Sequence, residues 1–368
     1  MFIKVQDIVQ VMEEYAPLHL AEKWDNPGLL TGSLQQTVNK VMLALDVTPD
    51  VVKQAIAEDV QMIIAHHPVI FSPLKNLAET NWQNKMLAEI LRHNIAVYCA
   101  HTNLDITNNG VNDILANKLA LQNIKDLSIL GQEQLRKIVV FVPFDYVDKV
   151  ANAMSQEGAG HIGKYSDCTF RVEGTGTFKP LTGTKPFIGQ VDNLEKVSEI
   201  RLETVVTKDN EQRVIKAMLD NHPYEEVAYD VYALLNEYNS WSLGRIGELT
   251  EQLSVAEFAQ KVKKALNLEY VLYADAGKKV KKVAVCGGSG SDLIDIALKK
   301  GADVLVSADF KYHTVQQAKF SGLSVVDASH QGTELPIVNT LHDYLIKQFP
   351  SKKLAVLLAQ EEFILQHV

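Results

Sequence analysis

Short apolar segments alternate with helical segments along the first part of the chain, and this alternation constrains the fold more than any other feature. Residues 41–47 and 60–65 are apolar runs of strand length, and residues 49–58 between them have a helical pattern with proline in the first turn. A further helix at 81–93 leads to a strand at 95–99. This order, in units of about 30 residues, predicts a parallel sheet, where ligands gather at the carboxyl ends of the strands.

Two adjacent histidines, His66 and His67, follow the strand at 60–65 and precede Pro68. Proline favours an extended conformation at the residue before it. Consecutive side chains of an extended chain point to opposite sides, so the pair suits two neighbouring metal ions better than a single ion. A loop pair without any ligand fits this stretch alone equally well. Partners at other strand ends therefore have to decide between the two interpretations.

Such partners follow two other strands. The strand at 95–99 runs into His101 and Asp105, and a strand at 323–326 is followed by His330 and Glu334. The last two residues are four apart across the start of a helix expected at about 333–348, which can place both on one face.

The candidate ligands number three imidazoles and two carboxylates. They are too few for two closed tetrahedral sites unless a carboxylate bridges and water or substrate fills the remaining positions. Open positions are typical of a catalytic metal site. Two divalent ions with two carboxylates leave a residual positive charge that favours an anionic substrate. Nitrogen and oxygen ligands without thiolate fit zinc, iron, manganese or cobalt. The candidate ligands are His66, His67, Asp105, His330 and Glu334.

The pattern changes between about residues 130 and 240. Strand-like and helical segments there follow the order β-α-β-β-α-β of a ferredoxin-like unit. The glycine-rich stretch 158–165 does not match a dinucleotide-binding GxGxxG between strand and helix. A turn before an edge strand explains His222, Glu225 and Glu226 more simply than a second metal site does. We therefore predict an α/β host domain of two βαβ-rich halves, interrupted by a ferredoxin-like insertion; the host covers 1–128 and 240–368, and the insertion 129–239.

Composition limits the classes of function. The 368 residues are 46% hydrophobic and 22% charged, as in a soluble globular protein. A net charge of -9 argues against a general nucleic-acid or anionic-membrane binder, although it leaves room for a local basic pocket. The start resembles no signal peptide, and no apolar run has the length of a membrane span, so we expect a cytoplasmic protein. Three dispersed cysteines, Cys99, Cys168 and Cys286, fit reduced thiols.

Five motifs together carry a resemblance to a known family, the NIF-three-like family, which is also named GTP cyclohydrolase 1 type 2. The resemblance covers nearly the whole chain outside the insertion. It implies a dinuclear metal centre with ligands at His66, His67, Asp105, His330 and Glu334. The motifs are Trp24-Asp25-Asn26-Pro27-Gly28-Leu29, Ala65-His66-His67-Pro68, His101-Thr102-Asn103-Leu104-Asp105, Asp309-Phe310-Lys311-Tyr312-His313 and Ser329-His330-Gln331-Gly332-Thr333-Glu334.

The middle segment is similar to the PII-like or CutA-like insertion of the longer bacterial members. The similarity lies in Gly158-Ala159-Gly160-His161-Ile162-Gly163 and His222-Pro223-Tyr224-Glu225-Glu226. In this family the resemblance implies a toroidal homohexamer, with metal sites facing an inner cavity and insertions that trimerise over its openings.

The leading hypothesis is a hydrolase with two divalent metal ions per subunit, zinc before iron, manganese or cobalt, acting on a small anionic or nucleotide-like substrate. An activated hydroxide would be the nucleophile, and with GTP it would open the guanine imidazole ring and release formate. His101 and His313 are candidates for moving protons, and Lys311 for meeting a phosphate. A phosphoesterase or nuclease-like enzyme is one alternative. A metal-holding regulatory scaffold with a ligand-sensing insertion is the other.

Overall fold

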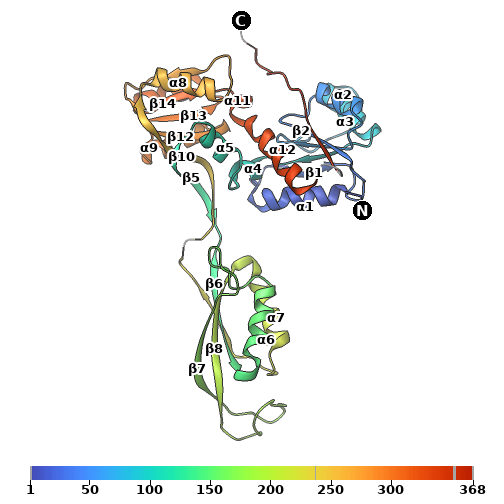
Figure 1. The fold of residues 1–368 in the computed structure, drawn as a ribbon, viewed down its shortest axis with the longest axis vertical. Coiled ribbons are helices and arrows are strands. Elements are labelled where there is room, and N and C mark those ends of the chain that lie inside the picture. The colour runs from blue at the N-terminus through green and yellow to red at the C-terminus, as the bar shows by residue number, and fades with distance from the viewer. Residues whose placement is uncertain (1, 237, 351–353, 367–368) are drawn as a thin grey trace. The chain divides into compact units, whose positions relative to one another are not determined.

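The computed structural model describes residues 2–236, 238–350 and 354–366. The chain divides into two compact units (Figure 1). Unit 1 consists of residues 1–130 and 241–368, and unit 2 consists of residues 131–240. In the part of the chain that is described, none of the helices combines the length and the apolar character needed to cross a membrane.

The first sheet of unit 1 has the strand order β1-β4-β3-β2-β15. Its strands are parallel except β1, which runs antiparallel to β4. Alternate residues of β3 pack on opposite layers, since Ile64 joins the side of α1 and α12 and Ile63 joins the side of α2 and α3. The elements are β1 (Gly28–Thr31), β2 (Lys40–Ala44), β3 (Met62–Ala65), β4 (Ala96–Cys99), β15 (Ala355–Leu358), α1 (Val5–Tyr15), the 3-10 helix η1 (Leu18–Leu20), α2 (Pro49–Ala57), α3 (Trp82–Arg92), α4 (Thr102–Ile106) and α12 (Pro336–Gln348).

The second sheet of unit 1 has the order β11-β14-β13-β12-β10-β5. Its central strands β12, β13 and β14 are parallel, whereas β10 and β11 pair in the antiparallel direction. Helices α5 and α8 cover one face, and α9 and α10 cover the other. The elements are β5 (Gln122–Gln132), β10 (Ser240–Leu253), β11 (Leu272–Ala274), β12 (Val280–Ser289), β13 (Val304–Ala308), β14 (Ser324–Asp327), α5 (Val111–Lys118), α8 (Val255–Ala265), the 3-10 helix η4 (Ser291–Leu293), α9 (Ile294–Lys299), α10 (Tyr312–Phe320) and α11 (His330–Glu334).

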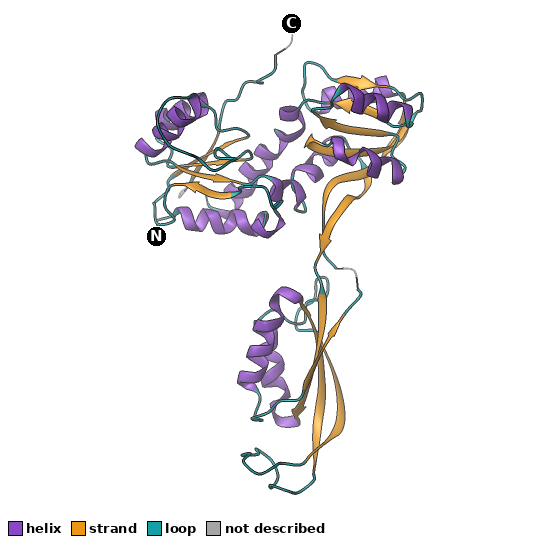
Figure 2. Ribbon diagram, turned by 180° about the vertical axis from the view of Figure 1, so that it is seen from behind, coloured by secondary structure: helices purple, strands orange, loops and turns teal. Residues whose placement is uncertain are grey.

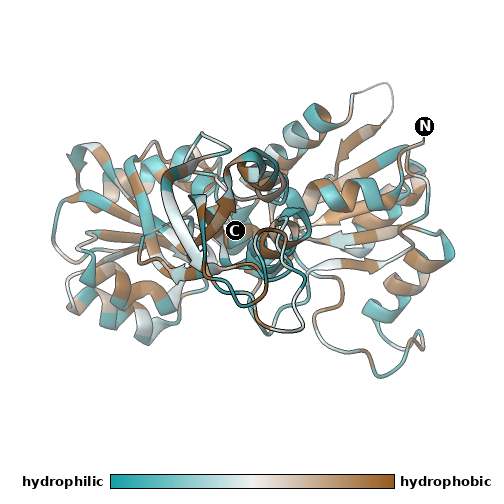
Figure 3. Cartoon of the chain, turned by 90° about the horizontal axis from the view of Figure 1, so that it is seen from below, coloured by the Kyte–Doolittle hydropathy of each residue, from teal (hydrophilic) through white to brown (hydrophobic). Residues whose placement is uncertain are grey.

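Both sheets of unit 1 are therefore sandwiched between helices, which explains why inner strands such as β3 and β13 are short and almost wholly apolar. Figure 3 shows this pattern, because hydrophobic residues run along the strands whereas the helices alternate hydrophobic and hydrophilic positions. The predicted α/β class is confirmed by this mixture of sheets and covering helices.

Two parts of the predicted pattern need correction. The helix expected at about 333–348 is two helices, because α11 begins at His330 and Pro336 starts α12. Strands β5 and β10 were not predicted, since β5 is mostly polar and exposed and β10 contains two glycines. These two strands are stabilised by backbone pairing within the sheet more than by an alternation of apolar and polar residues.

Unit 2 contains one antiparallel sheet of order β7-β8-β6-β9. Its elements follow the order β-α-β-β-α-β, and α6 and α7 pack on one face of the sheet through residues such as Val140 and Leu202 (Figure 2). The segment at His222 precedes the edge strand β9, as expected for a turn. The elements are β6 (Leu135–Pro143), β7 (Thr169–Phe178), β8 (Glu195–Thr207), β9 (Tyr229–Ala233), the 3-10 helices η2 (Phe144–Tyr146) and η3 (Lys208–Asn210), α6 (Val147–Gln156) and α7 (Glu211–Asn221).

Candidate metal centre

Four histidines and two carboxylates gather where parallel strands of both sheets of unit 1 end. His66 directly follows β3, and His101 closely follows β4. Asp105 lies on the short helix α4 behind it. His330 and Glu334 lie on α11, which follows β14. The strand ends thus supply the cluster, in agreement with the general position of ligand sites in α/β sheets.

Glu334 is the centre of this cluster, and its two carboxylate oxygens face different histidines. Oε1 lies 3.8 Å from Nε2 of His66, whereas Oε2 lies 3.1 Å from Nε2 of His67 and 3.2 Å from Nε2 of His330. Oδ1 of Asp105 lies 3.6 Å from Nε2 of His66. The two adjacent histidines thus face different oxygens of the same carboxylate, and His66 also faces Asp105.

Three groups of side chains among the described residues are close enough to hold a metal ion. All five predicted ligands occur in two of these groups, which share Glu334, and His101 completes the third. The groups are His66 with Asp105 and Glu334, His67 with His330 and Glu334, and His66 with His67 and His101.

Buried polar atoms without a hydrogen-bond partner mark the same place. Five such side-chain atoms occur in the described part of the chain, and three of them belong to the cluster: His66 Nε2, Asp105 Oδ1 and Glu334 Oε2. An unpaired buried polar atom is costly, so each of them calls for a partner. Two ligands of a tetrahedral ion with bonds of about 2.1 Å lie about 3.4 Å apart. The separations in the cluster, from 3.1 to 3.8 Å, fit a shared divalent ion.

Each of the four histidines is oriented through its Nδ1 atom. Carbonyl and carboxylate oxygens only accept hydrogen bonds, so Nδ1 carries the hydrogen and Nε2 keeps a lone pair for a ligand. Such bonds fix the tautomer and the ring orientation of metal-binding histidines. The pairs are His66 with the Ala100 carbonyl (2.8 Å), His67 with Asp46 (2.9 Å), His101 with Asp25 (2.7 Å) and His330 with Asp309 (2.6 Å).

The roles of Asp25, Asp46 and Asp309 were not recognised in the sequence. Asp309 directly follows β13 and Asp46 closely follows β2, so their position at the carboxyl ends of parallel strands was an available signal. Asp25 also accepts hydrogen bonds from the backbone and the hydroxyl of Thr102. Although burial opposes ionisation, these bonds and His101 lower the pKa of Asp25 to about 2. Asp25 is therefore a fixed negative charge behind His101.

Gly288, at the end of β12, is a further residue that sequence reasoning missed. Its backbone has φ +58°, and a Cβ atom there would collide with Oε1 of Glu334 and lie 3.1 Å from Nε2 of His330. Its N–H also donates to the hydroxyl of Thr333. Only glycine lets β12 approach the cluster so closely, and the run Gly287-Gly288 was the sequence signal for it.

The ionisable groups of the cluster strongly perturb one another. Burial, reinforced by Glu334, raises the pKa of Asp105 to about 6. Burial favours the neutral form of Glu334 as well, yet the facing imidazoles hold the pKa of its carboxyl well below the usual range. Contact with Glu334 raises the pKa of His330 to about 9. The buried carboxylates thus favour a positive charge on the facing imidazoles, and a bound cation would supply that charge while each Nε2 keeps its lone pair.

Two predicted residues differ in their surroundings. His101 lies inside the cluster, with its ring centroid 5.3 Å from that of His66 and 5.5 Å from that of His67. His313 is exposed on α10, where its ring packs edge-on against Tyr312, and it belongs to none of the three groups. Its proposed part in proton transfer stays a prediction.

An aromatic pair lies beside the cluster. Trp24 and Phe71 are 57% and 51% exposed, and their ring centroids are 5.8 Å apart. Both rings also contact His101, at 6.0 and 6.4 Å between centroids. Exposed aromatic rings next to a polar cluster provide a surface on which a flat molecule can stack.

Comparison with known proteins identifies the family. The Duf34/NIF3 (NGG1p interacting factor 3) family model matches residues 3–362. A Bacillus subtilis protein named GTP cyclohydrolase 1 type 2 homolog is 45% identical over 331 residues, which cover 90% of this chain and 89% of that protein. A protein of the same name from Halalkalibacterium halodurans is 44% identical over 326 residues, 88% of each chain.

Solved structures agree with this result. The crystal structure of a Bacillus cereus protein related to NIF3 matches with a TM-score of 0.87 and 41% identity, covering 100% of both chains. A Staphylococcus aureus protein matches with a TM-score of 0.83 and 29% identity, covering 100% of this chain and 99% of that one. The family indicated by the five sequence motifs is confirmed: this chain belongs to the Duf34/NIF3 (NGG1p interacting factor 3) family.

Proposed function

We propose that this protein is a hydrolase that depends on two divalent metal ions and acts on a nucleotide-like substrate. The observation that carries the proposal is the sharing of Glu334, whose two carboxylate oxygens face two different groups of nitrogen and oxygen ligands. A carboxylate in this position is suited to bridge two ions. His66 and Asp105 would hold one ion, and His67 and His330 the other.

Ions bound there would act as Lewis acids on the bond attacked and would lower the pKa of a water molecule toward neutrality. Zinc suits imidazole and carboxylate ligands best, with iron, manganese and cobalt as alternatives. Each group supplies three protein ligands, counting Glu334 in both, which leaves room for water and substrate, as in other catalytic sites.

His101 is placed to move a proton. Its Nδ1–H is bound to Asp25, so the charge that forms when Nε2 accepts a proton is stabilised by a fixed carboxylate. The ring lies edge-on to both His66 and His67. Nε2 of His101 would take a proton from the attacking water and return it to the leaving group.

The aromatic pair supports a substrate with a flat ring. Trp24 and Phe71 present exposed faces beside His101, and aromatic side chains bind nucleobases by stacking. The name of the relatives, GTP cyclohydrolase 1 type 2 homolog, points to the same class of compound. We therefore infer that the base stacks at this pair while the reacting bond lies over the metal ligands.

Metal analysis of purified variants tests the ligand assignment. We expect about two divalent ions per chain in the wild type. Asp105→Asn and His330→Ala each affect one group and should each remove about one ion, whereas Glu334→Gln affects both groups and should remove both. His93→Ala, which changes an exposed histidine at the end of α3, serves as the control. If Glu334→Gln kept both ions, the shared-carboxylate assignment would be wrong.

Product analysis tests the reaction. Metal-loaded protein is incubated with GTP and other nucleotides, and formate and phosphate are measured separately. Formate release supports ring opening, and phosphate release identifies a two-metal phosphoesterase instead. Loss of turnover in Trp24→Ala with full metal content would support the stacking surface. The absence of any turnover by metal-loaded protein across the nucleotide panel would overturn the hydrolase proposal and favour a regulatory scaffold.

We also propose that unit 2 is a PII-like or CutA-like insertion and that six chains assemble into a ring. The β-α-β-β-α-β order and the strand order of its sheet support the first part. Light scattering on the full chain tests the second part, because a hexamer has six times the chain mass of 40.9 kDa.

A further inference from the structure

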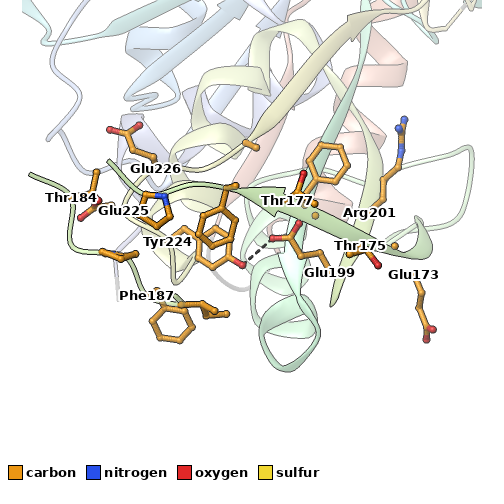
Figure 4. Close-up of a pocket in the computed structure, with 18 of the residues that line it drawn as sticks. Glu173, Thr175, Thr177, Thr184, Phe187, Glu199, Arg201, Tyr224, Glu225 and Glu226 are labelled. Atoms are coloured by element: carbon orange, nitrogen blue, oxygen red, sulfur yellow. Dashed lines mark hydrogen bonds between the residues drawn. The ribbon is translucent and has the colours of Figure 1, made fainter. Parts of the chain in front are cut away.

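Unit 2 contains a cavity of about 580 Å³ on the face of its sheet that is turned away from α6 and α7 (Figure 4). Strands β7 and β8 form its floor, and the loop 180–188 and the segment 224–228 form its walls. Its volume lies within the usual range for small-molecule sites. The cavity belongs to neither the metal centre nor the reaction proposed for it.

Two glycines of β7 keep this space open. Gly174 pairs directly with Glu199 across the sheet, so both lie on the same face. A Cβ atom at Gly174 would meet nothing within 4 Å, whereas one at Gly176 would collide with Oε2 of Glu199. Gly174 thus leaves volume above the sheet, and Gly176 makes room for the carboxylate.

Glu199 is the buried charge of this cavity. It is only 8% exposed, and its Oε1 accepts a hydrogen bond of 2.9 Å from the hydroxyl of Tyr224 (Figure 4). Burial and Glu199 raise the pKa of the Tyr224 phenol, so this hydroxyl keeps its proton and remains the donor. One neutral donor does not balance a buried negative charge, and a cation is the partner that would.

The other charges around the cavity favour the same sign of ligand. Among the residues that line it, Glu173, Glu225 and Glu226 add to Glu199, and Arg201 is the single basic residue. Nε of Arg201 is already bound to Glu203 at 2.8 Å. A cleft lined mainly by carboxylates attracts cations and repels anions.

Aromatic rings supply the apolar part of the wall. The ring of Tyr224 contacts those of Phe178 and Phe187, at centroid distances of 6.0 and 6.2 Å. Such rings bind apolar groups and also attract a cation over their faces. The combination of a buried carboxylate with aromatic walls is suited to one ligand that carries both features.

We propose that this cavity binds a small organic cation, with an ammonium or guanidinium group at Glu199 and an apolar body against Phe178, Phe187 and Tyr224. The ammonium would donate to the carboxylate that Tyr224 holds in place. The rings would cover the carbon skeleton and exclude water from the ion pair, which strengthens the charge-assisted hydrogen bond.

Calorimetric titration of the full chain with 2-phenylethylammonium tests the proposal. We expect saturable binding, and binding at least about tenfold weaker for neutral 2-phenylethanol and for anionic 3-phenylpropanoate. Glu199→Gln keeps an acceptor for Tyr224 but removes the charge, and should weaken the ammonium by about tenfold or more. Glu157→Gln is the matched control, since it removes a partly exposed charge of unit 2 at the end of α6 that is paired with Arg213 and does not line the cavity.

A second variant tests whether binding needs the free volume of the cavity above Gly174. Gly174→Leu places a side chain into the cavity without meeting the backbone, and should abolish binding while circular dichroism stays unchanged. If this variant fails to fold, Glu199→Gln still decides. The proposal is overturned if 2-phenylethylammonium shows no saturable binding, if the alcohol binds as tightly as the ammonium, or if Glu199→Gln binds like the wild type.

Discussion

Gly288 sets how closely β12 approaches the candidate metal ligands Glu334 and His330, and its replacement should separate the effect on the fold from the effect on metal binding. Gly288→Ala adds strain at φ +58° and forces Glu334 away from its position. We expect a loss of most bound metal and a lower melting temperature. Metal analysis and a thermal melt measure the two effects.

Gly277→Ala is the matched control for this prediction. Gly277 also has a positive φ, +81°, but a Cβ atom there meets nothing within 4 Å. It should show the backbone strain, about 1 kcal/mol, and keep its metal. Full metal content in Gly288→Ala would contradict the close approach described above.

His222 gives a prediction for pH. Its Nε2–H donates to the Phe141 carbonyl and its Nδ1 accepts from the Tyr224 N–H, so both nitrogens are satisfied only in the neutral ring. Burial lowers the pKa of His222 below its usual value. At a pH between the pKa of His222 in the folded protein and its pKa in the unfolded chain, the unfolded chain binds more protons. The contribution of His222 to folding stability is therefore complete above about pH 6.5 and decreases as the pH falls. Below the pKa of the folded state it does not decrease further.

Hydrogen exchange of peptides from unit 2 measures this effect. Exchange around residues 219–226 should accelerate between pH 7 and pH 5, after correction for the intrinsic rate. His222→Phe should be less stable at pH 7 but should lack the additional pH dependence. An identical pH dependence in both proteins would show that another group is responsible.

The sequence was enough to predict that the five candidate ligands lie together, whereas the partners that orient them could not be predicted. His66, His67, Asp105, His330 and Glu334 follow strands, and the general rule for parallel sheets was enough to bring them together. Asp46 and Asp309 also follow strands, but a carboxylate at a strand end gives no sign of which ring it will face. That choice depends on how the two sheets meet.

At the scale of elements, the segment after β15 supports the candidate metal centre through residues that are not themselves candidate ligands. The carboxylate of Glu361 accepts the N–H groups of Leu45 and Asp46, both at 2.8 Å. Asp46 in turn orients His67. The segment also contacts α11, since the side chain of Gln331 bonds the backbone of Glu362 and Ile364.

Glu361→Ala should therefore weaken the centre without touching a ligand. Two N–H groups lose their acceptor, which costs about 1–3 kcal/mol of folding stability, and His67 becomes less well oriented. We expect a lower melting temperature and a faster release of one metal ion to a chelator. Glu362→Ala should resemble the wild type, because Glu362 contacts Gln331 through its backbone carbonyl. Equal release rates in both variants would count against this role.

Helices were more predictable than edge elements. Thr48 and Ser254 accept backbone hydrogen bonds at the start of their helices, and such caps can be read from a sequence because they depend on residues within one turn. Strand β5 has no such local signal: its side chains are mostly exposed, and it exists because β10 pairs with it. Pairing between strands that are more than a hundred residues apart in the sequence cannot be recognised from a local residue pattern.

At the scale of the whole molecule, the chain passes from unit 1 to unit 2 through β5 and returns through β10. Strands β5 and β10 are neighbours in the second sheet, and just beyond them the N–H of Glu133 donates to the carbonyl of Asn239 at 2.9 Å. The two connections therefore resemble the last pair of a hairpin. Such a pair can be closed by a short turn.

Replacing residues 134–238 by Asn-Gly should leave unit 1 folded. The core clusters of unit 1 contain no residue from the removed segment, so we expect a cooperative melt and a metal content like that of the full chain. The same protein should lose binding of 2-phenylethylammonium. An aggregated or metal-free product would show that unit 2 is needed for unit 1 to fold.

The contact of Glu361 with Leu45 and Asp46 also bears on the order of events during synthesis. His66 and Glu334 leave the ribosome far apart in time, and Glu361 follows both. Domains fold as their segments emerge, so the early strands can form while the candidate metal ligands still lack their last partners. If the proposed ions are bound, we therefore expect them to be loaded late, after translation has passed residue 361.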